Sequence, residues 1–381
     1  MKLTKTIYLS IVGMLCVNTY AQEFDANLQL RPRYEYTNGF GTLLTPTTSH
    51  TSFIGQRTRL NLNYGDSKLK VKLALQNVRT WGNVNTLGNS STDKNGIAMY
   101  EGWAQYSFTD QWSTKVGRQM LSYDNQRVIG GLDWANQGRS FDAAVIKYKG
   151  KKDQLDLGFA LNADTEGKVA PSTPFVTDFK DMQYAWYHTN IKKLGLSFLT
   201  LNVGREYLKA PLDIETNYSQ TFGTYANIAY KKVTFDFSLY GQTGKIGTNN
   251  VSAWETAANL GFVLSPKVKA TLGYEYQFRS KLYSLKTLKA SFGYLWKENE
   301  RKEHQLMVSD ITYTSPQNVT QLYRDQIDLN QSLERIIEKQ LIFGPTYSYT
   351  YTNTMQRRKK NTFYFKGSVD FSGNITGLLT G

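Results

Sequence analysis

The sequence predicts an all-β protein, a transmembrane antiparallel β-barrel of about 14–18 strands with short periplasmic turns and long extracellular loops. Apolar and polar residues alternate with period two again and again, and no later stretch of about 18 apolar residues predicts a spanning helix. Aromatic residues make up 14% of the chain, including 26 Tyr, yet the mean hydropathy is −0.47. A membrane barrel combines these properties because only every second residue faces lipid. A soluble β-sandwich or β-solenoid is the alternative.

The N-terminal segment has the pattern of a secretory signal peptide. Lys2 and Lys5 form a basic start, residues 7–17 an apolar core, and residues 19–21 a cleavage site with small residues at its −3 and −1 positions. The core of about 11 residues is half of what a spanning helix needs. We therefore expect residues 1–21 to be cleaved during export to the outer membrane of a Gram-negative cell.

The single cysteine excludes thiol chemistry in the mature chain. Cys16 lies inside the signal segment and follows Leu15 instead of the small residue that a lipoprotein signal requires. The exported chain then has no disulfide and no Cys-based metal site. No other spacing of ligand residues indicates a metal or a cofactor, so we expect none.

The clearest predicted hairpin indicates which face of the sheet meets lipid and which meets the lumen. Residues 57–64 and 69–76 alternate around a tight turn at 65–67, with leucines on one parity and charged residues on the other. An Arg or Lys facing mid-bilayer lipid costs about 2–4 kcal/mol. Arg57 and Arg59 are therefore expected to face the lumen, and the apolar parity to face lipid.

Aromatic residues near predicted strand ends are expected to form girdles at the membrane interfaces. They are Tyr36, Tyr64, Phe108, Trp112, Tyr230 and Tyr240.

The net charge of +14 indicates a surface or lumen that favours anions. Strand parity makes Arg57, Arg59, Arg79, Lys70 and Lys72 candidates for lumen anion contacts. The alternative is a lattice of ion pairs that stiffens the wall, with Glu35, Glu101, Asp124, Asp133 and Asp142 as partners. Basic side chains at the rim, facing anionic lipid head groups, would also account for the charge. The basic residues are spread over many strands, which disfavours nucleic-acid binding.

The densest motif runs from Gly117-Arg118-Gln119 through Arg127 and Asp133-Trp134 to Gly138-Arg139-Ser140-Phe141-Asp142. With it, residues 23–280 resemble the alginate export family of outer-membrane porins. The resemblance implies a barrel that passes anionic polysaccharide through a basic lumen. It also implies that Arg118, Arg127 and Arg139 face the pore.

The last hundred residues resemble the surface-antigen barrel of outer-membrane assembly factors. The resemblance rests on three segments, 285–300, 343–351 and 363–374, and on a polar insert with a helix-like run around 322–337. We therefore divide the chain into a signal peptide (1–21), an alginate-export-like barrel region (22–284) and assembly-factor-like strands (285–381) that complete the barrel or are appended to it. The chain ends at 378–381 without an aromatic-terminated strand, which favours a fusion of two barrel fragments or a truncated frame.

The predicted function is a porin-like channel for passive passage of anionic oligo- and polysaccharides. Its expected partners are outer-membrane lipid, the anionic saccharide and, during biogenesis, the outer-membrane insertion machinery. The alternatives are a barrel fragment of an assembly factor and a non-functional fusion. An outer-membrane phospholipase would need a Ser–His pair and an orienting group. Of the three histidines, His188 lies in a predicted strand without a serine motif, so we expect no enzyme.

Overall fold

The computed structural model describes residues 23–37, 49–84, 96–166, 171–211, 213–279, 282–329, 331–353, 363–371 and 373–374. The predicted signal peptide, the basic run at 357–360 and the C-terminal end lie outside these residues. Within them, no helix is both long and apolar enough to cross a membrane.

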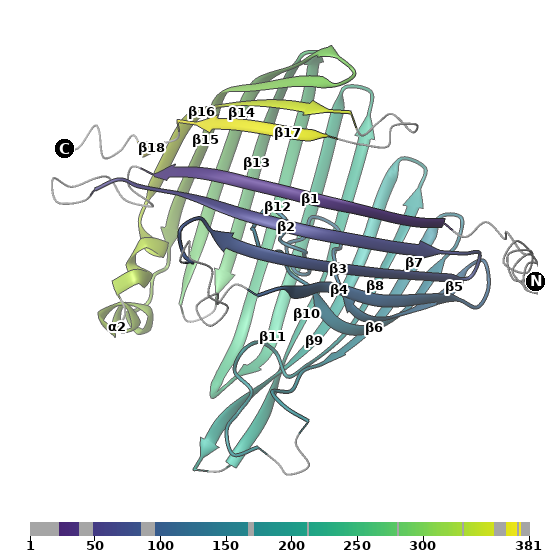
Figure 1. The fold of residues 1–381 in the computed structure, drawn as a ribbon. Helices are drawn as coiled ribbons and strands as arrows, with labels where there is room; N and C mark the ends of the chain where they lie inside the picture. Colours follow the sequence, from purple (N-terminus) through teal and green to yellow (C-terminus); the bar gives the residue numbers. More distant parts are fainter. Residues whose placement is uncertain are drawn as a thin grey trace, which may run out of the picture. The chain divides into compact units, whose positions relative to one another are not determined.

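The described residues are almost entirely β-strands (Figure 1). The strands are β1 (Glu23–Thr37), β2 (Thr51–Gly65), β3 (Leu69–Thr80), β4 (Ala98–Ser107), β5 (Trp112–Gln119), β6 (Phe141–Lys149), β7 (Asp153–Leu161), β8 (Asp181–Ile191), β9 (Leu194–Ala210), β10 (Asp213–Tyr230), β11 (Val233–Ile246), β12 (Asn249–Ser265), β13 (Val268–Arg279), β14 (Tyr283–Asn299), β15 (Lys302–Gln317), β16 (Gln340–Thr352), β17 (Tyr364–Asp370) and β18 (Gly373–Asn374). Between β15 and β16 lie the helix α2 (Gln321–Leu329) and the 3₁₀ helix η1 (Gln331–Ile337).

The chain divides into two compact units. The first holds β1 to β6 and the middle of β7, and the second holds the rest of β7 and β8 to β18. In the first unit each strand from β1 to β6 pairs antiparallel with the next. In the second unit the same meander runs from β8 to β17. The predicted boundary at 284/285 falls inside β14, which pairs with β13 and β15 along its length.

In the first unit, apolar side chains are exposed and charged ones are buried, the reverse of a water-soluble fold. On one face Leu28 is 68% exposed and its cross-strand neighbour Leu60 is 38% exposed. On the other face Arg57 is 0% exposed and Arg59 is 7% exposed. We call these the apolar face and the polar face. Charged side chains are almost never buried in soluble proteins unless they are paired, whereas a membrane barrel presents its apolar face to lipid.

The second unit has the same inversion. Phe222 and Leu272 are each 55% exposed, whereas Ser219 and Ser238 are 1% and 2% exposed. The strands therefore present apolar side chains outward and cover small polar ones, as the alternation predicts.

Some expectations hold and others need correction. The helix-like run predicted around 322–337 is present as α2 and η1. The long loops are fewer than predicted, because β9–β10, β11–β12 and β13–β14 also join through a few residues each.

Tyr240 does not belong to an interface girdle: it is 6% exposed and packs over Gly223 of the paired strand. The parity of Tyr240 places it opposite the exposed Leu239.

The predicted turn at 65–67 is stabilised by its own aspartate. The Asp66 carboxylate accepts hydrogen bonds from the backbone N–H groups of Lys68 (2.8 Å) and Leu69 (2.7 Å). These donors favour the charged form and lower the pKa of the Asp66 carboxyl. The turn fixes the register of β2 on β3, which positions Arg59 opposite Gln76.

Candidate functional site

The connection between β5 and β6, residues 120–140, is an ordered loop that folds onto the polar face of the first unit; we call it the β5–β6 loop. Backbone hydrogen bonds close it at two points, Tyr123 N–H to Ile129 O (3.2 Å) and Arg139 N–H to Gly131 O (2.6 Å). Leu121 and Ile129 are buried within it, with 4% and 3% exposure. Two apolar side chains of the loop are therefore shielded from solvent.

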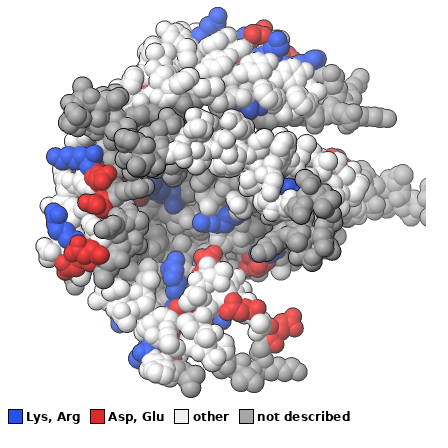
Figure 2. Space-filling model, turned by 60° about the vertical axis from the view of Figure 1, so that its left-hand side comes forward, with Lys and Arg blue, Asp and Glu red and all other residues white. Residues whose placement is uncertain are grey.

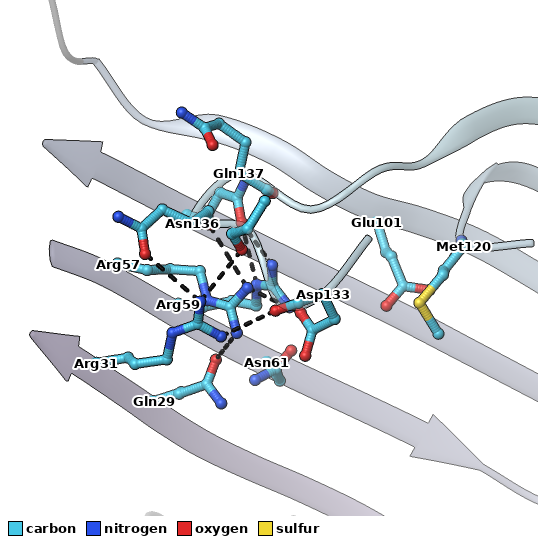
Figure 3. Close-up of polar contacts among 12 residues, drawn as sticks. Gln29, Arg31, Arg57, Arg59, Asn61, Glu101, Met120, Asp133, Asn136 and Gln137 are labelled. Atoms are coloured by element: carbon cyan, nitrogen blue, oxygen red, sulfur yellow. Dashed lines mark hydrogen bonds and ion pairs between the residues drawn. The ribbon is translucent and has the colours of Figure 1, made fainter. Parts of the chain in front are cut away.

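The tip of this loop brings one carboxylate to two arginines of β2 (Figure 3). Asp133 Oδ1 lies 2.8 Å from Arg57 Nη1 and 3.6 Å from Arg59 Nη1. Gln29 accepts a further hydrogen bond from Arg57 (2.9 Å), and Gln76 accepts two from Arg59 (3.1 and 2.8 Å). A buried guanidinium is tolerated only when such partners offset its desolvation. The loop and the strands thus depend on each other.

Two arginines of β1 bind the backbone of the same loop. Arg31 donates to the carbonyl oxygens of Asp133 (2.9 Å), Trp134 (2.9 Å) and Ala135 (3.3 Å). Arg33 donates to the Trp134 carbonyl (3.2 Å) and pairs with Glu35 (2.6 Å). These contacts hold the loop by its main chain, whatever its side chains are.

Tyr100 forms the floor of the cluster. It is the extra residue where the β3–β4 register shifts between Ala74 and Leu75, and the Arg59 guanidinium lies 3.5 Å from its ring centroid. Gly138, with φ +68°, passes so close that a Cβ there would lie 2.8 Å from the ring. The glycine that opens the Gly-Arg-Ser-Phe-Asp motif is therefore required both by its conformation and by the ring beneath it.

A second ion pair lies beside the cluster on the polar face. Lys72 pairs with Glu101, which is 4% exposed. Glu101 also accepts hydrogen bonds from Trp103 Nε1 (3.0 Å) and the backbone of Met120 (3.4 Å). The lattice of ion pairs that the sequence left as an alternative is present for Arg57, Arg59 and Lys72.

The structure places the other predicted basic residues at several positions. Lys70 lies on the polar face and is exposed, opposite Gln105 of β4. Arg127 and Arg139 are exposed on the β5–β6 loop. Anion contact by these three residues stays a prediction.

Arg79 and Arg118 were predicted to face the lumen, but both lie on the apolar face. Arg79 lies opposite Gln56 in the β2–β3 register and donates a hydrogen bond to the Asn77 side chain (2.9 Å). Its position in β3 has the same parity as the exposed leucines and the opposite parity to Lys72. Arg118 pairs with Asp142 (3.5 Å) on the same face as Val116, which is 52% exposed. Both lie at strand ends on the apolar face, because register and not charge decides the face of a strand residue.

Sequence reasoning missed Arg31, Arg33 and Tyr100 as site residues. Arg31 and Arg33 share a parity in β1, as Arg57 and Arg59 do in β2, and Arg31 lies opposite Arg57 in the strand register. The alternation along the sequence could therefore have placed them on the polar face. For Tyr100 no signal existed, since a β-bulge shifts the register there.

One histidine does meet a serine in the second unit. His188 Nδ1 lies 2.9 Å from Ser197 Oγ, and the His188 ring stacks on Trp186. Ser197 is 1% exposed, however, and in the described part of the chain no carboxylate contacts His188. A buried serine without an orienting acid does not form a hydrolytic triad. Nor do the described residues contain a cluster of His, Cys, Asp and Glu that could hold a metal.

Charge is interspersed on the surface. Figure 2 shows Lys and Arg side chains among uncharged residues, several with Asp or Glu beside them. On the face that Figure 2 shows, the described basic side chains are therefore dispersed among neutral and acidic ones.

The sequence matches the family model described as alginate export over residues 20–279. The chain belongs to the alginate export family. The match covers more than half of the chain and ends where β13 ends. No curated protein matches the chain significantly.

Solved outer-membrane porins have the same fold. OccD3 (OpdP) of Pseudomonas aeruginosa superposes with a TM-score of 0.58 at 10% identity, covering 93% of this chain and 87% of the porin. OccK8 (OprE) of the same organism gives 0.57 at 11%, covering 93% and 95%. A BenF-like porin from Pseudomonas fluorescens Pf-5 gives 0.56 at 11%, covering 92% and 94%. This alginate export family member is therefore an outer-membrane β-barrel of the porin type.

Proposed function

We propose that this member of the alginate export family passes anionic oligo- and polysaccharides passively through a basic lumen. The observation that carries the proposal is the charge of the polar face in the first unit. From β2 to β5 this face holds five basic side chains, those of Arg57, Arg59, Lys70, Lys72 and Lys115, and one acidic side chain, that of Glu101.

The chemistry of these groups suits a uronate. Guanidinium groups keep their charge at every physiological pH and bind carboxylates through two parallel hydrogen bonds. Lys70 and Arg33 are accessible, with Arg33 side-chain exposure at 42%. A row of weak sites lets a polyanion enter without trapping it. Trp103, over which Lys115 lies at 3.9 Å, adds an aromatic surface on the same face.

Liposome swelling tests substrate class. The protein purified from outer membranes, with an expected N-terminus at Gln22 after signal-peptide cleavage, is reconstituted and given galacturonate or glucose. We expect galacturonate to permeate several-fold faster, since a favourable local potential raises substrate concentration at the pore by about tenfold or more. Raising the salt concentration screens the potential and should remove the difference.

Charge reversal supplies the matched control for this assay. Arg33→Glu with Lys70→Glu should reverse the preference, whereas Lys267→Glu, in the short turn between β12 and β13, should leave it unchanged. Equal rates for both sugars in the wild-type protein would contradict the proposal.

The runner-up functions rest on the C-terminal residues alone. A barrel fragment of an assembly or insertion factor, or a fusion without a transport role, follows from the resemblance of residues 285–381. The continuous pairing of β13, β14 and β15 supports a single porin-type meander instead. A protein that folds but leaves the liposomes impermeable to both sugars would favour the fusion.

A further inference from the structure

We propose that the carboxylate of Asp133 occupies the place that a uronate carboxylate takes on Arg57 and Arg59, so that substrate binding exchanges one carboxylate for the other. The inference rests on the proposed function and names the residue that sets the affinity of that site. The β5–β6 loop thus carries a carboxylate, that of Asp133, which competes with the substrate carboxylate for the same two arginines.

The contact made by Asp133 is an incomplete one. A single oxygen, Oδ1, makes both arginine contacts, at 2.8 and 3.6 Å, and the Asp133 side chain is 57% exposed. A free carboxylate can bring both of its oxygens to a guanidinium in the fork geometry that gives the stronger bond. Water and solutes also reach Asp133 directly, so a ligand can approach from its side without unfolding the loop.

The arginine side of the site has unused hydrogen-bond capacity. Arg57 Nε and Tyr100 Oη are buried and have no hydrogen-bond partner among the described residues, and Arg57 and Tyr100 are 0% and 4% exposed. Unsatisfied buried polar atoms are rare, and each one costs free energy. A sugar acid carries carboxylate and hydroxyl oxygens on one rigid ring, which suits these two donors together with Arg59.

The loop stays attached when the carboxylate leaves. Arg31 and Arg33 hold the carbonyl oxygens of Asp133 and Trp134, and these contacts do not use the Asp133 side chain. The exchange therefore breaks the contacts of the Asp133 carboxylate with Arg57 and Arg59. The hydrogen bonds from Arg31 and Arg33 to the loop backbone remain. This separation makes Asp133 replaceable without loss of the fold.

The test measures block of single-channel current by a trimer of galacturonic acid. Asp133→Asn keeps the size of the side chain and removes the competing charge. We expect the half-blocking concentration to fall about fivefold, the upper end for a partly exposed charge pair. Maltotriose, a neutral trimer, should block wild type and variant equally.

Glu35→Gln is the matched control, because it removes one negative charge from the same polar face but leaves Arg57 and Arg59 untouched. It should change the half-blocking concentration less than about twofold. Equal shifts in both variants would mean that only overall charge matters, and an unchanged or weaker block in Asp133→Asn would also overturn the exchange. Block of the wild type together with either of these results would overturn the inference but leave the proposed function standing. If the trimer blocks neither protein, both fail.

Hydrogen exchange on the wild-type protein tests the same exchange without a substitution. The galacturonate trimer should speed exchange of backbone amides in residues 131–139, since Asp133 loses its partners, whereas maltotriose should not. Slower exchange or no change in this segment, with block present, would overturn the inference.

Discussion

Replacing Arg57 with alanine is expected to lower the free energy of unfolding by about 3 kcal/mol. Arg57 is 0% exposed, and its guanidinium joins Asp133 at 2.8 Å to Gln29 at 2.9 Å. Its removal leaves a cavity, strips Gln29 of its partner and removes the side-chain contact of the β5–β6 loop, while Arg31 and Arg33 still hold the main chain of the loop. Because Asp133 is 57% exposed and can rehydrate, we expect the lower end of the range for a broken buried pair.

Urea-dependent folding into detergent micelles measures this loss. Lys70→Ala, which removes an exposed basic side chain from the same face, should stay within about 0.5 kcal/mol of the wild type. The loosened loop should also make the open-channel current of Arg57→Ala noisier. An Arg57→Ala protein as stable as Lys70→Ala would mean that the arginine cluster does not anchor the loop.

Gly117→Ala is expected to have a still larger effect, more than about 3 kcal/mol, and to prevent barrel formation at ordinary temperatures. Gly117 has φ +119°, a conformation that L-residues rarely adopt. An added Cβ would overlap the carbonyl oxygen of Gly102 and lie 2.9 Å from Trp103 Cα. Both belong to the backbone of β4, which cannot move aside without breaking its pairing with β5.

Heat-modifiable migration on gels reports whether the folded barrel forms. Gly96→Ala is the control, because a Cβ there meets nothing within 4 Å, and it should migrate like the wild type. Normal folding of Gly117→Ala would show that the strand tolerates a side chain at this position, and the conformation of the Gly-Arg-Gln motif would need another explanation.

Much of the fold was predictable because alternation is a local property. The parity of residues 57–64 and 69–76 assigned both faces of the β2–β3 hairpin, and the energy of a charge in lipid decided which face was which. Arg57 and Arg59 were found in this way. Arg118 was expected at the pore from family resemblance, yet its register with Asp142 puts it on the apolar face.

The partners of these arginines were not predictable, because they lie far away in the sequence. Arg57 meets Asp133 across 76 residues, through a loop closed by its own backbone hydrogen bonds. Asp133 was named among the possible ion-pair partners, but nothing local linked it to β2. Tyr100 reaches Arg59 only because the register of β3 and β4 shifts, and a β-bulge of this kind leaves little mark on the alternation.

The polar face of the first unit is expected to make the channel wall selective for anions. The reversal potential of single channels in a planar bilayer under a KCl gradient measures this selectivity. We expect the sign of the reversal potential to show a preference for chloride over potassium. This potential should shrink or reverse when Arg33→Glu is combined with Lys70→Glu. A potential for potassium preference in the wild-type channel, or one that this double charge reversal leaves unchanged, would contradict this expectation.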